Sequence, residues 1–235
     1  MNLDELTIIV PTKNEAHNIS TFLCSLPSQA WLIVVDSSQD ETLRIVLSRR
    51  PARTTVIRTD AGVTHARQAG ADAARTPWLL FTDADIVFGP NYFTHIRRWQ
   101  ESVAVYGPKL SLDSYAGYYR WFARGQRLSQ ALGIPAASGS NLLVSRQVFE
   151  SVGGFDLRLT CNEDSELAFR IRRRGFRVYY DPDLIVYEQD HRRLKRGAAR
   201  KTLHSLVRCS LLYMGLMPAK WRQNDWGYWT TPAEC

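Results

Sequence analysis

Residues 78–85, Trp78-Leu79-Leu80-Phe81-Thr82-Asp83-Ala84-Asp85, place two carboxylates directly after an apolar run, and a second apolar run, Ile86 to Phe88, follows. A continuous apolar run of this length is typical of a strand buried on both faces. Two carboxylates between such runs can emerge at a sheet edge and face one point, which suits Mg²⁺ or Mn²⁺. With 14 aspartates in 235 residues, however, about one DxD pair is expected by chance, and Asp181 and Asp183 form a second.

Working outward, short apolar runs alternate with helical patterns along most of the chain. The patterns predict helices over residues 16–26, 42–47, 66–74 and 92–99, the last with Pro90 at its first position. This alternation predicts an α/β fold with a mostly parallel central sheet flanked by helices. The predicted strands are 6–10, 31–35, 54–58, 78–82, 103–106, 141–144, 176–180 and 184–187.

The composition narrows the class of protein. Apolar residues make up 45% of the chain and charged residues 23%, which is typical of a soluble folded protein. The longest mostly apolar stretch, Cys209 to Met217, has nine residues, whereas a membrane span needs about 20. The acidic start does not predict a signal peptide. The four cysteines lack CxxC spacing, so we expect no zinc site and a cytoplasmic location.

Ligands of such sheets bind where the strands end. Polar residues follow each of the first four predicted strands: Pro11 to Glu15, Asp36 to Asp40, Asp60 with Gly62 and Arg67, and Asp83 with Asp85. Asp36 can accept hydrogen bonds from a nucleobase or ribose, and the alternative is a helix cap, although Asp40 and Thr42 serve that need better. Likewise, Asn14 can simply cap the first helix.

Two further positions have both a functional and a structural interpretation. Glu163 and Asp164 open a predicted helix, so Asp164 can be a general base, but Thr160 and Glu163 also have the spacing of a capping box. His191 follows the last predicted strand. A lone histidine is usually structural or solvated, and a metal or phosphate ligand is the alternative.

The positive charge lies mostly near the C-terminus. Residues 170–222 hold 14 Lys/Arg against 4 Asp/Glu, a balance of +10, whereas the rest of the chain holds 16 against 19. Residues 192–235 are predicted to form a basic amphipathic helical tail. Arg196, Arg200, His204 and Arg208 recur every four residues, opposite Leu203, Leu206, Val207, Leu211 and Met214, with Trp221, Trp226, Tyr228 and Trp229 behind them. The tail either contacts an anionic membrane surface or packs on the domain with its basic face solvated.

Six blocks in order, from Leu6 to about His191, resemble the inverting GT-A glycosyltransferases of family 2. They cover about four-fifths of the chain. The blocks are Ile8–Glu15, Val34–Thr42, Gly62 to Ala74 with Arg67, Phe81–Asp85, Gly139–Val144, and Val152–Asp156 leading to Glu163, Asp164, Arg170 and Gly175. The resemblance implies a GT-A nucleotide-diphospho-sugar transferase fold over residues 1–191.

The resemblance also implies roles for residues at matching positions. Pro11, Thr12, Glu15 and Asp36 would hold the base and ribose, Arg67 would reach the nucleotide, and Asp83 and Asp85 would bind the ribose and a Mg²⁺ or Mn²⁺ on the diphosphate. His191 would lie near the metal, and Asp164 would be the general base beside Glu163. The implied reaction moves one sugar from a UDP- or GDP-sugar to an acceptor hydroxyl with inversion.

Two departures from the family pattern matter. Val35 stands where the second block usually has another acid, which leaves base recognition to Asp36. The Gln/Arg-x-x-Arg-Trp element of processive synthases is absent, because His95 precedes Ile96-Arg97-Arg98-Trp99. Transfer of a single sugar is therefore favoured over polymerisation.

Two other classes of protein are alternatives to a glycosyltransferase. A nucleotidyltransferase should carry a glycine-rich basic loop after the first strand, where Pro11 to Glu15 has no glycine. A non-catalytic nucleotide- or membrane-binding module would not need Asp83, Asp85 and Asp164. No motif indicates a nucleic-acid partner. Aromatic residues at 107–137 suit a lipid-linked, for example polyprenyl-linked, acceptor, and we hypothesise peripheral attachment to the inner face of the cell membrane.

Overall fold

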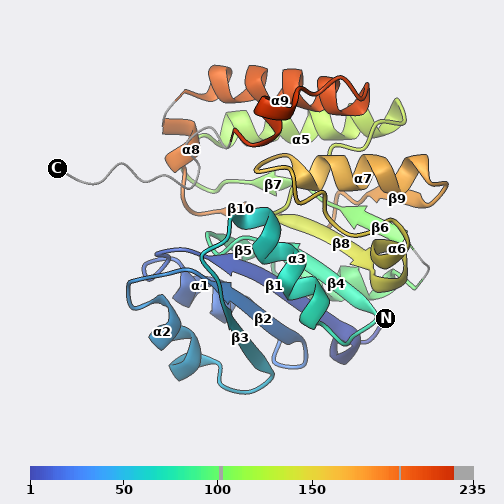
Figure 1. Cartoon of the computed structure of the whole chain (residues 1–235). Helices are drawn as coiled ribbons and strands as arrows, with labels where there is room; N and C mark the ends of the chain where they lie inside the picture. Colours follow the sequence, from blue (N-terminus) through green and yellow to red (C-terminus); the bar gives the residue numbers. More distant parts are fainter. Residues whose placement is uncertain (101–102, 196, 225–235) are drawn as a thin grey trace.

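The central feature of the computed structural model, which describes residues 1–100, 103–195 and 197–224, is a seven-stranded sheet (Figure 1). Its order is β3-β2-β1-β4-β8-β6-β9, and only β8 runs against its neighbours. The prediction of a mostly parallel central sheet is therefore confirmed. The strands are β1 Leu6–Thr12, β2 Trp31–Asp36, β3 Thr54–Arg58, β4 Trp78–Thr82, β6 Val103–Tyr106, β8 Asn141–Ser145 and β9 Arg177–Tyr180.

A second, three-stranded sheet had not been predicted as such. It joins β5 (Ile86–Phe88), β10 (Val186–Glu188) and β7 (Lys109–Leu110), with β10 in the middle. The short strands β5 and β7 exist because they pair with β10, which lies far away in the sequence. This pairing brings the segment after β10 next to the DxD turn, where the Gln189 amide donates to the Asp85 carbonyl at 2.8 Å.

Helices cover both faces of the large sheet because alternate residues of each strand point to opposite sides. Ile8 and Val10 of β1 belong to one apolar core, and Ile9 belongs to the other. The first core packs against α1 (Ile19–Cys24), α2 (Thr42–Arg49) and α4 (Tyr92–His95), and the second against α3 (Val63–Ala73), α6 (Arg146–Ser151) and α7 (Glu163–Arg173). Helix α3 needs small residues, because a Cβ at Gly70 would overlap the Ile9 side chain.

Several local predictions at helix starts are wrong. Helix α4 begins at Tyr92 with Asn91 as its N-cap, so Pro90 lies outside the helix rather than at its first position. The N-cap of α1 is Asn18, not Asn14. The residue before α7 is Asn162 in a left-handed conformation (φ 62°), and its side chain makes no capping bond, so Thr160 and Glu163 do not form a capping box.

The remaining helices form an outer layer next to the small sheet (Figure 1). They are α5 (Ala116–Ala131), α8 (Arg192–Lys195), α9 (Ala198–Tyr213) and α10 (Ala219–Arg222), and single turns of 3₁₀ helix lie at Leu3–Glu5 and Ile96–Arg98. The sequence patterns did not predict α5 or α6. Among the described residues, no helix has the length and hydropathy needed to cross a bilayer.

Helix α9 forms as predicted, but the environment of its side chains differs from the expected one. Arg208 is buried, whereas Leu203, Leu206, Val207 and Met214 are exposed. The interpretation in which the apolar side packs and the whole basic side is solvated is therefore wrong for these residues. Arg196, Trp226, Tyr228 and Trp229 lie outside the described residues. A domain boundary at residue 191 stays a prediction.

Candidate functional site

The ends of β1 and β2 are joined by a buried carboxylate. The strand β1 extends through Pro11 and Thr12, and Thr12 pairs with Asp36 in the parallel register. Pro11 is tolerated here because β4 pairs only with Leu6 to Ile9, which leaves no partner for a Pro11 amide on that side. The Thr12 hydroxyl donates to Asp36 Oδ1 at 2.7 Å, and Arg58 at the end of β3 forms an ion pair with Asp36 Oδ2.

Neighbouring turns are tied to each other by hydrogen bonds to side chains. The Asn14 amide donates to Ser38 Oγ at 2.8 Å, and the Gln39 amide donates to Asn14 Oδ1 at 2.9 Å. Asp40 lies just before the N-cap of α2, Glu41, and accepts from the amide of Thr42, the first residue of the helix, at 3.0 Å. The helix-capping alternative for Asp36 is therefore wrong, and the exits of β1 and β2 form one connected, ordered edge.

Glu15 links this edge to the segment after β10. Its carboxylate accepts from Arg192 Nη2 and from Asn18 Nδ2, both at 2.7 Å. Burial lowers the pKa of Arg192, but the hydrogen bond to Glu15 and the nearby charges of Asp190 and Asp85 outweigh that effect and raise it. Arg192, which the sequence did not single out, therefore lies among the carboxylates at the open edge.

The centre of the site is Arg67, which lies buried between two carboxylates from distant elements. Its Nη2 donates to Asp83 Oδ1 at 2.6 Å, and its Nη1 forms an ion pair with Glu163. The Ser140 hydroxyl donates to Asp83 Oδ2 at 2.5 Å. Burial raises the pKa of Glu163, and the Arg67 charge opposes the shift. A buried arginine between two carboxylates holds β4 and α7 together at the strand exits.

Asp164 lies beside this pair but in a different environment. It is partly exposed, whereas Glu163 is buried. The Ser165 amide donates to Asp164 Oδ1 at 2.6 Å, and the Gly139 amide donates to Oδ2. Gly139 must be a glycine, because a Cβ there would overlap the Arg67 guanidinium. Two amide donors therefore fix the orientation of the Asp164 carboxylate at the start of α7.

His191 is buried and contacts the segment before α5. Its Nε2 lies 2.9 Å from Asp113 Oδ1, and its Nδ1 lies 3.3 Å from the Tyr119 hydroxyl. The hydrogen bonds from His191 and Ser111 lower the pKa of Asp113 to about 2. Burial raises the pKa of Tyr119, and the charges of Glu188 and Asp85 add to the shift against that of Lys109. Tyr119 therefore lies within electrostatic reach of Asp85 while its hydroxyl contacts His191.

The metal hypothesis can be tested on this geometry. Among the described residues, no three His, Cys, Asp or Glu side chains converge as a ready-made metal site. Magnesium usually takes only one or two carboxylates and completes its shell with water and substrate phosphates. Asp85, with Asp83 two residues before it, fits that pattern. Ser140 and Arg67 both bond the Asp83 carboxylate.

Structure reveals site residues that the sequence patterns left without a role. Arg58 and Asp36 are partners in the parallel register of β3 and β2, so a register prediction could have paired them. Ser140 and Gly139 belong to a block that was noted only for its spacing. Lys109 and Glu188 form a buried ion pair between β7 and β10, two strands whose pairing no local pattern indicates.

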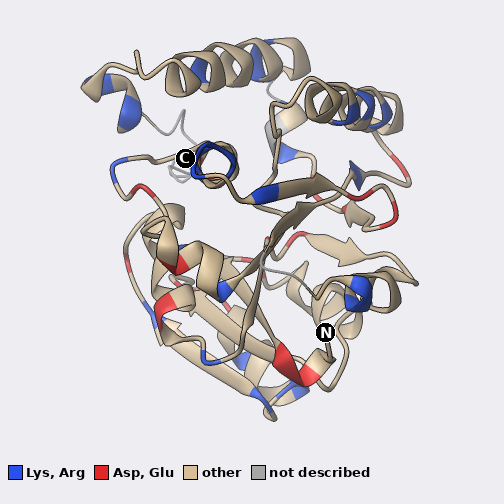
Figure 2. Ribbon diagram, turned by 90° about the vertical axis from the view of Figure 1, so that its right-hand side faces the viewer, with Lys and Arg blue, Asp and Glu red and all other residues tan. Residues whose placement is uncertain are grey.

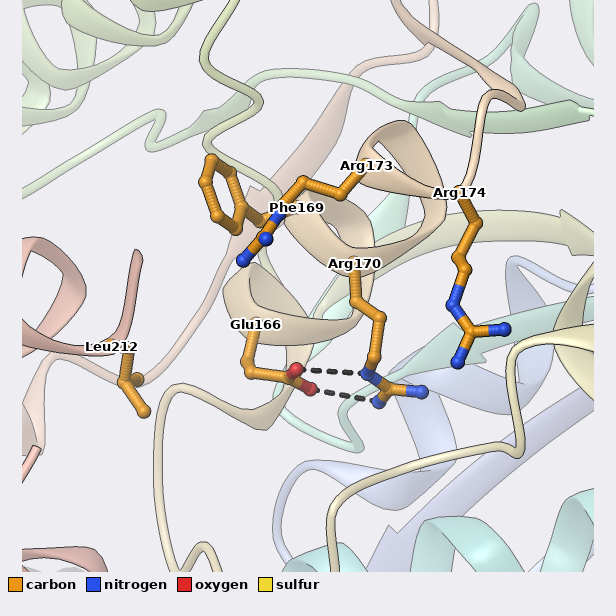
Figure 3. Close-up of a pocket in the computed structure, with 6 residues that line it drawn as sticks. All are labelled: Glu166, Phe169, Arg170, Arg173, Arg174 and Leu212. Atoms are coloured by element: carbon orange, nitrogen blue, oxygen red, sulfur yellow. Dashed lines mark hydrogen bonds and ion pairs between the residues drawn. The ribbon is translucent and has the colours of Figure 1, made fainter. Parts of the chain in front are cut away.

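A shallow cavity of about 270 Å³ lies elsewhere, on the outer side of α7 (Figure 3). In Figure 3, the Glu166 carboxylate binds the Arg170 guanidinium in a two-bond pair, with both contacts at 2.8 Å. The other lining residues are Phe169, Arg173, Arg174 and Leu212. None of the predicted site residues lines this cavity, so it is not the candidate donor site.

Comparisons with known proteins agree on a family. A sequence model described as glycosyltransferase-like family 2 matches residues 5–204. The pre-mycofactocin glycosyltransferase of Mycobacterium tuberculosis is 24% identical over 237 aligned residues, which cover 85% of this chain and 46% of that protein. The succinoglycan biosynthesis protein ExoA of Rhizobium meliloti is 25% identical over 80% of this chain and 66% of its own length. The chain thus spans about half to two-thirds of these curated relatives.

Solved structures show the same fold. A mannosyltransferase from Pyrobaculum calidifontis, in complex with GDP-Man and Mn²⁺, superposes with a TM-score of 0.66 at 21% identity, covering 93% of this chain and 72% of that one. TarS of S. aureus, residues 1–349 with UDP, gives 0.62 at 15% identity over 90% of this chain and 70% of that one. At such identities the similarity shows the fold.

Proposed function

The chain belongs to the glycosyltransferase-like family 2, and from this membership we propose that it is an inverting glycosyltransferase. It moves one sugar from a nucleotide-diphosphate sugar to an acceptor hydroxyl. The observation that carries the proposal is the convergence of Asp83, Arg67, Glu163 and Asp164. These residues come from α3, α7 and the turn after β4, yet one buried arginine, Arg67, pairs with both Asp83 and Glu163, and Asp164 follows Glu163 directly.

The two acids at the start of α7, Glu163 and Asp164, have different roles. Glu163 is buried and committed to Arg67, so it positions the helix rather than contacting substrate. Asp164 is partly exposed and is the general base. It takes the proton of the acceptor hydroxyl, the hydroxyl oxygen attacks the anomeric carbon, and the bond to the diphosphate breaks. A single in-line displacement inverts the anomeric configuration.

The donor binds along the ends of β1, β2 and β4. Pro11, Thr12, Glu15 and Asp36 hold the base and ribose, and Arg67 orders Asp83 for the ribose or diphosphate. Asp36 is fully buried and already bonds Thr12 and Arg58, so a donor reaches it only if Arg58, which is more than half exposed, shifts. The donor is a UDP- or GDP-sugar.

Asp85, together with Asp83, would hold a Mg²⁺ or Mn²⁺ that also binds the donor diphosphate. A bound divalent cation would neutralise the charge that develops on the leaving nucleotide diphosphate. His191 is the third metal-site residue in this proposal. Both of its ring nitrogens already face Asp113 and Tyr119, so we assign it a supporting role behind Asp85.

The acceptor is lipid-linked and the protein works as a peripheral protein at the inner face of the membrane. Supporting this are the half-exposed aromatic residues of α5 and the basic helices that follow the site. Tyr118 and Phe122 stack with ring planes 13° apart, and Trp121 lies next to them and is exposed. Such faces suit sugar rings or an isoprenoid chain.

The first test is calorimetric binding of UDP and GDP, with and without Mn²⁺, to the wild type and to Asp85→Ala. We expect one nucleotide to bind in a metal-dependent way and Asp85→Ala to weaken it at least tenfold. Asp4→Ala is the matched control, because Asp4 is exposed on the N-terminal turn. Asp164→Asn should keep nucleotide binding and lose transfer. Metal-independent nucleotide binding without any sugar transfer would favour a non-catalytic binding module. Transfer retained in Asp164→Asn would overturn the assignment of Asp164 as the base.

A further inference from the structure

Two segments that pack in the outer layer lack acidic residues. Residues 114–140 hold three Arg and no Asp or Glu, and residues 191–224 hold nine Lys/Arg and no Asp or Glu. Together they contribute +12 to a chain whose net charge is +7, so the remaining residues sum to −5. Figure 2 shows this contrast: the coloured segments along the uppermost helices are blue, and red segments gather in loops and in the lower half.

The same two segments expose most of the large apolar side chains that are not buried. Among the described residues, fifteen large hydrophobic side chains are exposed, and all but Trp31, Leu47, Leu112 and Leu157 lie between residues 115 and 134 or between 203 and 221. Leu128 on α5 is 64% exposed and Leu203 on α9 is 65% exposed. Single exposed apolar side chains need no explanation, but eleven in two neighbouring segments indicate a partner.

Helices α5 and α9 lie side by side in this layer (Figure 1). The Tyr118 hydroxyl of α5 is 3.1 Å from the Thr202 hydroxyl of α9, and the Lys201 ammonium lies 5.8 Å from the centre of the Tyr118 ring. On α5, Trp121, Leu128 and Leu132 follow helical spacing, as do Leu203, Leu206, Val207 and Met214 on α9. The exposed side chains therefore belong to adjacent stripes on adjoining helices.

We infer that the exposed side of α5 and α9 is one docking surface for an anionic lipid bilayer. Leucine and tryptophan enter the interface while arginine and lysine contact the headgroups. A nucleic acid would be attracted by the charge but would leave the leucines in water. A second copy of this chain would bring two basic surfaces together. An anionic bilayer is the partner that matches both the positive charge and the exposed apolar side chains.

This inference deepens the proposed function and rests on it in one respect, because the surface would bring a lipid-linked acceptor to the site. It also revises the location of the membrane contact. The contact was expected in the tail alone, but half of the surface belongs to α5, within residues 1–191. Arg208 is buried on the inner side of α9 and does not take part.

The test is sedimentation of the full chain with vesicles of phosphatidylcholine alone or mixed equally with phosphatidylglycerol. We expect binding only to the anionic vesicles. The paired change Arg124→Gln with Arg200→Gln should lower the partition coefficient by on the order of 30-fold, from about 1 kcal/mol for each arginine. Leu128→Gln with Leu203→Gln should lower it severalfold. The matched control is Leu47→Gln with Arg49→Gln on α2, which should bind as wild type.

Nucleotide binding without vesicles, measured on the same samples, separates this inference from the proposed function. Surface variants that keep metal-dependent nucleotide binding but lose vesicle binding support the docking surface. The inference is overturned if wild type ignores anionic vesicles, if the α2 control loses as much binding as the surface variants, or if the surface leucines mediate self-association instead. Binding to nucleic acid that is unaffected by Leu128→Gln with Leu203→Gln, without vesicle binding, would also overturn it.

Discussion

Charged side chains are paired at the strand exits, whereas in the α5–α9 layer positive charge is in excess. At the strand exits, buried arginine and carboxylate groups are paired, as in Arg67 with Asp83 and Glu163. In the α5–α9 layer, cationic side chains lie among exposed leucines, and neither helix contains an acid. The difference teaches that the first region is complete within the chain and preorganised for a small polar ligand. The second has a surplus of charge and apolar area that only a partner can match.

Arg208 belongs to neither pattern and connects the two regions. It is buried, but its partners are neutral: Asn162 Oδ1 at 3.2 Å and the backbone carbonyls of Cys161, Trp221 and Asn224. The Thr160 amide also donates to the Arg222 carbonyl at 3.1 Å. The end of the described tail is thus bound to the loop immediately before Glu163 and Asp164.

The largest effect on stability is expected when Arg67 is removed. Arg67→Ala leaves the buried Glu163 and the partly buried Asp83 without their cation, so we expect a loss of about 3–5 kcal/mol in the free energy of unfolding. Urea denaturation of the variant checks this value. If Arg67→Ala does not fold, Arg67→Lys keeps a charge without the two-pronged geometry and should lie between it and wild type.

Arg58→Ala is the matched control for this experiment. Arg58 also pairs with a fully buried carboxylate, Asp36, but its own side chain is more than half exposed, so water can replace it. We expect a cost of about 1 kcal/mol. Equal losses in the two variants would contradict the idea that the buried position of Arg67 sets the size of the effect.

Substitutions of two arginines of α9 should affect stability and vesicle binding separately. Arg208→Ala leaves carbonyl oxygens unsatisfied and a cavity, so we expect a loss of about 2–3 kcal/mol in unfolding free energy. Because the loop before Asp164 loosens, turnover should fall more than nucleotide affinity. Arg200→Ala, on the exposed side, should cost less than about 0.5 kcal/mol and weaken vesicle binding instead.

Thermal or urea unfolding and steady-state kinetics of both variants, together with vesicle sedimentation, measure these contrasts. Arg208→Lys should recover part of the stability, because an ammonium reaches fewer of the carbonyls than a guanidinium. Similar stability losses for Arg200→Ala and Arg208→Ala would show that the two sides of α9 are not energetically distinct.

The smallest expected effect concerns the rate at which the Cys209 thiol is alkylated. Burial raises the pKa of the Cys209 thiol to about 11, with a contribution from the Asp164 charge. At pH 8 about one thiol in a thousand is then ionised, so Cys209 should alkylate far more slowly than the exposed Cys24. Mass spectrometry of the labelled peptides distinguishes the sites. The rate at Cys209 should rise about tenfold per pH unit up to its pKa, and fast labelling at pH 8 would indicate that α9 opens from α7.

Much of the fold could be predicted where one strand carries its own signal. The bounds of β3, β4 and β6 agree with the predicted residues, and β1 and β2 were predicted but continue into Pro11-Thr12 and Asp36. Polar residues at a strand end carry no apolar signal, so their pairing with the next strand decides the bounds. Strands β5 and β7 were missed because they are two or three residues long and depend on β10.

The sequence analysis also did not predict helix α5, but for a different reason from the one that applies to β5 and β7. Its apolar residues form an exposed stripe, and its aromatic residues were interpreted only as a binding face for the acceptor. Of the candidate site, Asp83, Asp85, Asp36 and Asp164 were selected from the sequence, and their proposed roles remain to be tested. The pairing of Arg67 with both Asp83 and Glu163, and the role of Ser140, could not be predicted from local patterns.

The sequence by itself determined the α/β class, the mostly parallel sheet and the edge where the acids gather, because apolar periodicity and strand ends are local properties of the chain. Only the tertiary structure decided which charges are paired and buried and which are exposed. Arg67 and Glu163 are 96 residues apart, and Arg208 takes its partners from residues 161–162 and 221–224. Burial and ion pairing depend on what packs against a side chain, and that is settled only when distant elements meet.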